Sequence, residues 1–264
     1  TANDQGNLEN IGAGTYTAVV TDENGCSDTV TVEITENEPI SISEEPSDYT
    51  GSGVSCNGQT DGFIDLTTTG GTQVYTYDWT DQDGNAVTAN DQGNLENIGA
   101  GTYTAVVTDE NGCSDTVTVE ITENEPISIS EEPSDYNGSG VSCNGETDGF
   151  INLTTTGGTQ VYTYNWTDQD GNVVTANDQG NLENIGAGTY TAVVTDENGC
   201  SDTVTVEITE PEIGVEVTEE HSDYTGAGVS CNGETDGFID LTTIGGTQVY
   251  TYNWTDQDGN VVTA

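Results

Sequence analysis

The chain has no lysine and no arginine, against 48 aspartate and glutamate residues, so its formal net charge is −48. Only His221 could offer a side-chain cation to these carboxylates. Two carboxylates about 7 Å apart in water repel by roughly 0.6 kcal/mol, and dozens of such pairs add up. Because nothing is available to neutralise phosphates, the composition excludes nucleic acid as a partner and argues equally against an anionic membrane.

Apolar residues are also scarce, at 31% of the chain, and no run of them is long enough to cross a membrane. Extreme acidity with few apolar residues is typical of disordered chains. Here, however, Val, Ile, Tyr and Trp alternate with polar residues over many segments, which is the pattern of a half-buried sheet. We therefore expect a folded chain that does not insert into a membrane.

The residues that are present form a tandem repeat. Residues 1–87 and 88–174 differ at only five positions, and a third copy starting at Thr175 carries one extra residue before Cys231. A period of 87 residues is large enough for each copy to be a small domain, unlike shorter solenoid repeats. Thr263-Ala264 match Thr1-Ala2, so we expect an excerpt of a longer array, or a subunit whose half-domains are completed by its neighbours.

Each copy has a strict period of two, interrupted by glycine-containing turns such as Asp83-Gly84-Asn85 and Asn111-Gly112. About seven short strands with one tryptophan on a central strand are typical of an immunoglobulin-like β-sandwich. Tyr103 stands where such a fold places its tyrosine corner. Only the segment NLENI, at Asn94–Ile98, suggests a single helical turn. The predicted fold is all-β.

This reading divides the chain into complete repeats at 39–125 and 126–212, between a C-terminal half-repeat at 1–38 and an N-terminal half-repeat at 213–264. The segments that join the repeats are short. They contain Pro39, Pro126 and Pro211, so we expect stiff joints and an elongated rod. In such a rod the aromatic stripe Tyr75, Tyr77 and Trp79 is interpreted as core rather than as a ligand platform.

Two cysteines recur in each copy, in VSCNG and in ENGCSD. Without a CxxC motif or nearby histidines they indicate disulfides and an oxidising, extracellular location rather than zinc. We expect Cys56–Cys113 and Cys143–Cys200 to form within domains, each closing a loop of roughly 57 residues. Cys26 and Cys231 would then pair across the join with partners in missing or neighbouring halves. Bridges between adjacent domains are the alternative.

Acidic residues gather in the turns, where oxygen atoms at positions i, i+2 and i+4 could face one hard cation such as calcium. A turn near the C-terminal end of one domain and a turn near the N-terminal end of the next would meet the acids of the joint, and calcium bound there would stiffen it. The alternative is that the acids are merely hydrated. The candidate ligands are Asp81, Asp83, Asn85, Asp168, Asp170, Asn172, Asp256, Asp258, Asn260, Asp109, Glu110, Asp196, Glu197, Glu123 and Glu125.

The sequence resembles the SprB-type repeat of Bacteroidota gliding-motility adhesins. The resemblance lies in four motifs that follow one another in every copy: Cys-Asn-Gly…Asp-Gly (143–149), Gly-Gly-Thr…Tyr-Thr-Tyr-x-Trp (157–166), Gly-Ala-Gly-Thr-Tyr-Thr (186–191) and Val-Thr-Asp-x-Asn-Gly-Cys (194–200). It implies a very large cell-surface protein, secreted by the type IX system, whose tandem sandwich domains serve as adhesins or motility fibres rather than as enzymes.

The sequence therefore predicts a calcium-stiffened extracellular stalk that holds an adhesive tip away from the cell surface, with other copies of the repeat as its partners. Two alternatives remain: the repeats bind glycans or surfaces multivalently, or subunits polymerise head-to-tail by completing each other's half-domains. Paired carboxylates could serve a glycosidase. Since no basic residue is available to orient a substrate, we expect no enzymatic activity.

Overall fold

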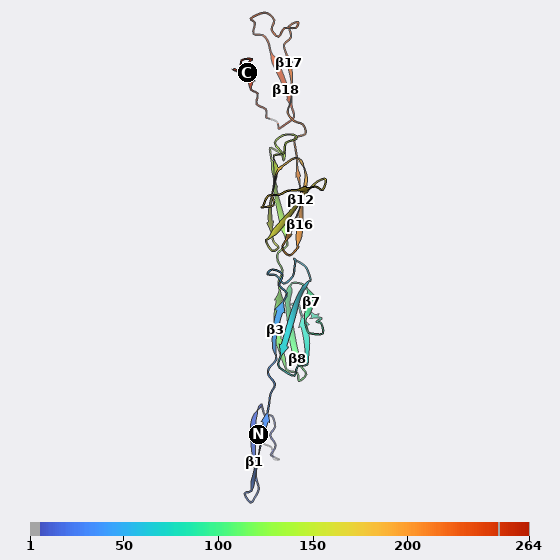
Figure 1. Cartoon of the computed structure of the whole chain (residues 1–264), viewed down its shortest axis with the longest axis vertical. Coiled ribbons are helices and arrows are strands. Elements are labelled where there is room, and N and C mark those ends of the chain that lie inside the picture. The colour runs from blue at the N-terminus through green and yellow to red at the C-terminus, as the bar shows by residue number, and fades with distance from the viewer. Residues whose placement is uncertain (1–5, 248, 264) are drawn as a thin grey trace. The chain divides into compact units, whose positions relative to one another are not determined.

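A computed structural model describes residues 6–247 and 249–263, and every regular element among these residues is a β-strand (Figure 1). The chain forms two compact units, Thr1–Glu123 and Asn124–Ala264, which are described separately below. Each unit contains one β-sandwich and one partial repeat.

The sandwich of the first unit consists of two antiparallel sheets. A three-stranded sheet has the order β3-β4-β7, and a four-stranded sheet has the order β6-β5-β8-β9. The strands are β3 (Ser41–Pro46), β4 (Gly62–Thr69), β5 (Tyr75–Thr80), β6 (Ala86–Val87), β7 (Leu95–Ile98), β8 (Gly101–Asp109) and β9 (Ser114–Ile121). Seven strands divided in this order between two sheets form an immunoglobulin-like sandwich, as predicted.

The core lies between the two sheets, where the inward residues of each strand meet. Trp79 is buried among Ile64, Leu95, Ala105 and Ile121. Its indole Nε1 donates a hydrogen bond to the backbone oxygen of Gly93 at 2.8 Å, so the buried polar atom is satisfied. The period-two pattern of the sequence therefore places the apolar residues as predicted.

Tyr103 fixes the connection between β7 and β8. It is buried, and its hydroxyl donates a hydrogen bond to the backbone oxygen of Gly99 at 3.0 Å, four residues upstream. This contact is the geometry of a tyrosine corner, and the prediction for Tyr103 is confirmed.

The predicted helical turn at NLENI is wrong, because Leu95–Ile98 is strand β7. It pairs with β4 antiparallel, with a register shift between Gly62 and Phe63. Asn97 has a φ of 56°, a left-handed conformation that asparagine tolerates. Burial of Leu95 and Ile98 under the tryptophan core outweighs the local turn tendency.

The second unit contains an equivalent sandwich with the sheet orders β10-β11-β14 and β13-β12-β15-β16. Its strands are β10 (Ser128–Pro133), β11 (Gly149–Thr156), β12 (Tyr162–Asp168), β13 (Val173–Val174), β14 (Leu182–Ile185), β15 (Gly188–Asp196) and β16 (Ser201–Ile208). Trp166 takes the place of Trp79 in its core.

The partial repeats keep the pairings that lie within them. In the first unit, β1 (Gly14–Thr21) and β2 (Ser27–Ile34) form a hairpin. In the second unit, β17 (Glu216–His221) pairs with β18 (Ile239–Ile244), and β19 (Trp254–Thr255) pairs with β20 (Val261–Val262). These strands correspond to parts of the complete sandwich without the sheets that would cover them.

Candidate functional site

The acidic turns and the cysteines lie at the two ends of each sandwich. The chain enters the first sandwich beside Glu38, whose backbone oxygen accepts a hydrogen bond from the amide of Gly71 at 2.8 Å. It leaves beside Thr122, whose backbone oxygen accepts a hydrogen bond from the amide of Gly53 at 2.8 Å. We call these the N-terminal end and the C-terminal end of the sandwich.

At the C-terminal end, Asp81 organises its own turn. Its Oδ1 accepts hydrogen bonds from the backbone amides of Asp83 and Asn85, at 2.9 and 2.8 Å, and both its oxygens accept from the Asn85 side-chain amide. The hydrogen bond from the Asn85 side chain lowers the pKa of Asp81 most, and the hydrogen bonds from backbone amides lower it further. The turns at Asp168–Asn172 and Asp256–Asn260 repeat the arrangement.

At the N-terminal end, Asp109 is buried in the turn between β8 and β9. Its Oδ2 accepts from the amide of Thr72 at 3.1 Å, and its Oδ1 accepts from the amides of Asn111 and Cys113 at 3.0 and 2.9 Å. Burial raises the pKa of Asp109, but the hydrogen bonds together outweigh it, so that the pKa is lowered overall. Asp196 makes the same contacts with Thr159 and Cys200.

The remaining candidate ligands have other roles or face solvent. Glu123 Oε2 accepts a hydrogen bond from the amide of Gly58 at 2.7 Å. The backbone oxygen of Glu125 accepts from Gly158, and the amides of Glu110 and Glu197 each donate to a threonine hydroxyl, at 3.1 Å. Asp83, Asp170 and Asp258 are exposed.

Within the part of the chain that the structure describes, no three acidic, histidine or cysteine side chains gather closely enough to hold a metal ion. The Asp81 turn and the Asp196 turn do lie at the C-terminal end and the N-terminal end of their own sandwiches, as the strand count predicts. Calcium binding at the joint stays a prediction.

The cysteines fall into two classes. The turn cysteines (Cys26, Cys113 and Cys200) follow an Asn-Gly turn, and the loop cysteines (Cys56, Cys143 and Cys231) lie in the long connection after the first strand of each repeat. Cys56 and Cys200 are disulfide-bonded, whereas Cys26, Cys113, Cys143 and Cys231 are free and exposed.

The predicted bonds Cys56–Cys113 and Cys143–Cys200 are therefore not formed, and this prediction was wrong. Cys113 precedes β9 at the N-terminal end, while the loop that contains Cys56 contacts Thr122 and Glu123, beyond the other end of β9. An eight-residue strand is about 24 Å long, whereas bonded cysteines need Cα atoms within about 7 Å. Cys26 and Cys231 would be separated in the same way in a completed domain.

The aromatic stripe belongs to the core and its edge. Trp79 is buried, and Tyr75 and Tyr77 are half-buried with their rings in an edge-to-face contact at 6.4 Å. The Tyr77 ring covers Gly93, where an added Cβ would lie 2.6 Å from it. The interpretation of the stripe as core holds for Trp79, and the stripe offers no fully exposed aromatic platform.

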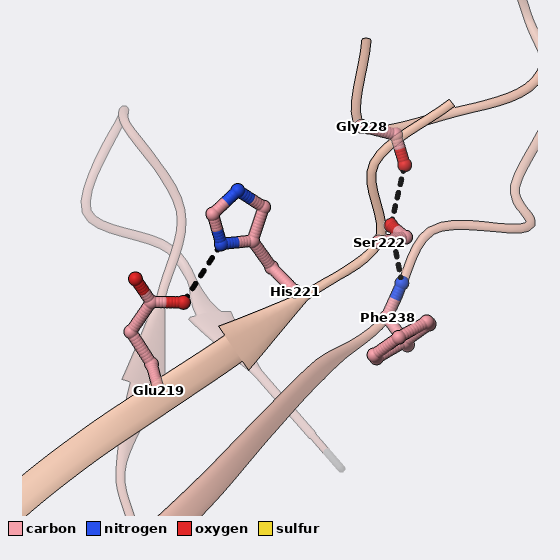
Figure 2. A network of polar contacts seen from close by, with 5 residues as sticks. All are labelled: Glu219, His221, Ser222, Gly228 and Phe238. Atoms are coloured by element: carbon pink, nitrogen blue, oxygen red, sulfur yellow. Dashed lines mark hydrogen bonds and ion pairs between the residues drawn. The ribbon is translucent and has the colours of Figure 1, made fainter. Parts of the chain in front are cut away.

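Sequence reasoning missed two polar arrangements that Figure 2 shows in the partial repeat of the second unit. His221 Nδ1 lies 2.7 Å from Glu219 Oε2, and this carboxylate raises the pKa of His221. The Ser222 hydroxyl donates to the Gly228 oxygen and accepts from the Phe238 amide, as Ser47 does in the complete sandwich. The i, i+2 spacing on a strand could have indicated the first pair.

The partial repeats expose the faces that the complete sandwiches bury. A hollow in the second unit is lined by Phe238, Ile239, Trp254 and Val262. A smaller one in the first unit is lined by residues that include Tyr16, Val30, Val32 and Ile34. The equivalent positions in the complete sandwich pack against one another in its core.

A family model described as the SprB repeat matches the chain at residues 52–84, 139–171 and 228–259. Each match begins in the loop before the second strand of a repeat and ends in the Asp-Gly-Asn turn. No curated protein matches the chain. Among the residues that the structure describes, no helix is long and apolar enough to cross a membrane.

Several solved structures are similar to this chain. Extracellular domains 3–5 of Drosophila OTK are 15% identical, over 75% of this chain and 71% of that one, with a TM-score of 0.32. The insect immune protein hemolin is 14% identical over 74% and 56%, with a TM-score of 0.30. A tetra-tandem repeat from the extending region of a large adhesion protein is 20% identical over 95% and 69%, with a TM-score of 0.26. TM-scores this low do not establish a fold. The immunoglobulin-like fold is therefore assigned from the strand order of the two sheets.

Proposed function

Because the chain carries SprB-type repeats, we propose that it is the stalk region of a cell-surface adhesin, in which copied sandwiches supply length and an adhesive part elsewhere supplies binding. The observation that carries this proposal is the near-identity of the two complete sandwiches. Their exposed residues form acidic turns that are hydrogen-bonded within themselves, and Trp79 and Trp166 are both buried. A copied unit of this kind is suited to spacing rather than to chemistry.

Deleting one period tests this proposal. Removal of residues 88–174 joins Val87 to Thr175, which restores the natural Val-Thr junction and leaves one complete sandwich fewer. A stalk should become shorter by the length of one domain in small-angle X-ray scattering, while neither form binds immobilised glycans. If the repeats are multivalent binders instead, the full chain should bind immobilised glycan about 10²-fold or more tighter than the shortened chain, because of avidity.

Calcium stiffening remains part of this proposal. It is supported by the absence of basic residues, which leaves 48 carboxylates without side-chain cations other than His221. Titration calorimetry of the whole chain with calcium tests it, together with melting in EDTA. Binding accompanied by a higher melting temperature would support stiffening, and the absence of both would refute it.

The apolar faces of the partial repeats favour a second candidate function, assembly of copies head-to-tail. Residues 6–34 of one copy would cover the hollow at Ile239 and Trp254 of another and so complete a sandwich. In a longer chain, neighbouring residues of the same molecule would fill these places. Sedimentation velocity over a hundredfold range of concentration tests assembly. A rising sedimentation coefficient that the Ile239→Asp variant abolishes would support it, and a constant coefficient would refute it.

A further inference from the structure

Four segments of the chain have the pattern Asn-x-Ser or Asn-x-Thr, which is the acceptor for Asn-linked glycosylation in secreted proteins. The SprB-type repeats indicate a cell-surface or extracellular protein, where such a modification can occur. Three of the four segments lie in the second complete repeat. Their asparagines stand among the five positions at which residues 88–174 differ from residues 1–87. The four candidate acceptors are Asn137, Asn152, Asn165 and Asn253.

Three of these segments are part of β-strands. Residues 152–154 belong to β11, which pairs with β10 and β14, and residues 165–167 belong to β12, which pairs with β13 and β15. The middle residues of these two segments, Leu153 and Trp166, contact the hydrophobic core. After Asn253, the next two residues form β19, which pairs with β20. A transferase must hold the acceptor segment in its own active site, so strand pairing protects these segments in the folded chain.

Asn137 lies instead at the tip of the loop that follows β10. The amide of Tyr136 donates a hydrogen bond to the backbone oxygen of Ser139 at 2.6 Å, and Asn137 and Gly138 form the turn between them. Asn137 has a φ of 56° and Gly138 a φ of 96°, so both are left-handed, as a type I′ turn requires. Both residues are exposed, and Ser139, which supplies the hydroxyl of the acceptor pattern, is half-buried.

The tip of this loop stands clear of other atoms, while its base is held firmly. A Cβ added at Gly138 would meet no atom within 4 Å. Below the tip, the amide of Gly138 donates to Asp135 Oδ1 at 2.6 Å, and the Tyr136 hydroxyl donates to the backbone oxygen of Asp148 at 3.0 Å. The loop therefore presents one acceptor asparagine on a fixed base, with room around its middle residue for an enzyme to approach.

We propose that Asn137 is the acceptor of an Asn-linked glycan in the folded protein, and that its place in the loop selects it over Asn152, Asn165 and Asn253. The donor is a sugar joined through its anomeric carbon to a diphosphate, as in a lipid-linked oligosaccharide. Asn137 Nδ2 forms a bond to the anomeric carbon while the bond from that carbon to the diphosphate oxygen breaks. The diphosphate leaves with the electron pair of the broken bond, and Nδ2 loses one proton.

A glycan on Asn137 would lie near the point where the chain leaves the second sandwich. Gly140, three residues further along the loop, donates its amide to the backbone oxygen of Thr209 at 2.8 Å, just after β16. Glycans are bulky and hydrated, so one placed here would shield the segment that follows Thr209 from proteases. This inference goes beyond the proposed stalk function and depends only on export of the chain from the cell.

Peptide mapping of the chain, purified from the cells that produce it, tests the proposal. The protein is reduced, alkylated and digested with a protease that cleaves after Asp and Glu, because it has no lysine or arginine for trypsin. Peptide 136–146 should carry a glycan that fragmentation places on Asn137. Peptide 49–61, which has Thr50 in place of Asn137, is the matched control and should carry none.

Three results of this mapping would overturn the proposal. The first is an unmodified peptide 136–146, and the second is an equal glycan on peptide 49–61, which would show that the attachment is not to asparagine. The third is equal modification of peptide 149–168, which contains Asn152 and Asn165, because the loop would then select nothing.

A substitution at Ser139 separates the acceptor pattern from the asparagine itself. Ser139→Ala removes the hydroxyl and keeps Asn137. The third repeat already has alanine at this position, where the amide of Tyr224 donates to the backbone oxygen of Ala227 at 2.6 Å, so the loop tolerates it. The glycan should be lost in Ser139→Ala and kept in Ser139→Thr, and its retention in Ser139→Ala would contradict the proposal. Circular dichroism checks the fold of both variants, and failure of the stalk proposal in scattering would leave the mapping result unaffected.

Discussion

Residues 14–34 and 101–121 have identical sequences and the same hairpin register, with Gly14 opposite Ile34 and Gly101 opposite Ile121. Their surroundings differ. Val119 is 5% exposed in the complete sandwich, whereas its counterpart Val32 is 49% exposed in the partial repeat. The local sequence is thus enough to form the hairpin, but burial requires the strands that only a complete repeat supplies.

The C-terminal partial repeat shows the complementary effect. Ile64 is fully buried, while its counterpart Ile239 is 54% exposed. The strand that contains Ile239 begins later than β4, and β19 keeps only Trp254–Thr255 of the longer strand β5. Strands of the sandwich interior lose length when their partners are missing, because their pairing is not fixed by a tight turn.

The largest difference in stability between the complete sandwich and the N-terminal partial repeat is expected when a core isoleucine is truncated. Ile121→Ala should cost about 2–5 kcal/mol of unfolding free energy, because it opens a cavity in a closed core, and Ile34→Ala should cost less than about 1 kcal/mol. Urea unfolding followed by NMR of the two hairpins, with segmental labelling to distinguish them, measures both, because the partial repeat that contains Ile34 has no tryptophan to report on it. Equal costs would mean that the hairpin face is covered in both regions.

The next largest loss of stability is expected when Gly93 is replaced by alanine. Gly93 has a φ of 85° and an added Cβ would lie 2.6 Å from the Tyr77 ring, whereas the equivalent Gly6, at 78°, has open space. Gly93→Ala should therefore destabilise its region by about 1–3 kcal/mol more than Gly6→Ala, which bears only the strain of the positive φ. Thermal melting monitored by near-ultraviolet circular dichroism compares them. A milder effect at Gly93 would contradict the contact with Tyr77.

The tyrosine corner should contribute less. Tyr103→Phe removes the hydrogen bond to Gly99 and should cost about 0.5–1.5 kcal/mol, while Tyr16→Phe, whose bond to Gly12 is exposed, should cost less.

Burial, and then the charge of Asp81, raises the pKa of Tyr103. Its contribution to stability should therefore be complete below the unfolded-state pKa of about 10 and should be lost as pH rises through the folded-state value. Urea unfolding between pH 8 and 11 should show a weaker alkaline loss in Tyr103→Phe than in the parent.

Asp109 gives the smallest expected effect, and in the opposite pH direction. Its pKa is lowered, so its stabilisation should be present above the unfolded-state value near 4 and should be lost as pH falls through the folded-state value. Asp109→Asn should make stability less dependent on pH in this acid range. Asp22→Asn is the matched control, because Asp22 is exposed and keeps only the bonds of its own turn. Identical acid profiles would show that the bond from Thr72 does not matter.

The alternating residues predicted the strands, the buried tryptophan and the tyrosine corner, because each depends on side-chain period or on neighbours close in sequence. Strand β7 escaped prediction, since pairing with β4 decides its conformation. The cysteine bonds were predicted within domains, but Cys56 and Cys113 lie at opposite ends of β9, which the sequence alone does not reveal. The Asp81 turn was recognised, but not that its carboxylate accepts hydrogen bonds from its own turn.

Hydrogen exchange followed by NMR tests most directly the central claim that a repeat becomes a stable unit only when both sheets are present. Strands β1 and β8 share the sequence GTYTAVVT, so their amides have equal intrinsic rates, and segmental labelling distinguishes them. At low protein concentration, β8 amides should exchange only through unfolding of the whole sandwich, and β1 amides should exchange orders of magnitude faster. Equal protection of the two strands would contradict the claim.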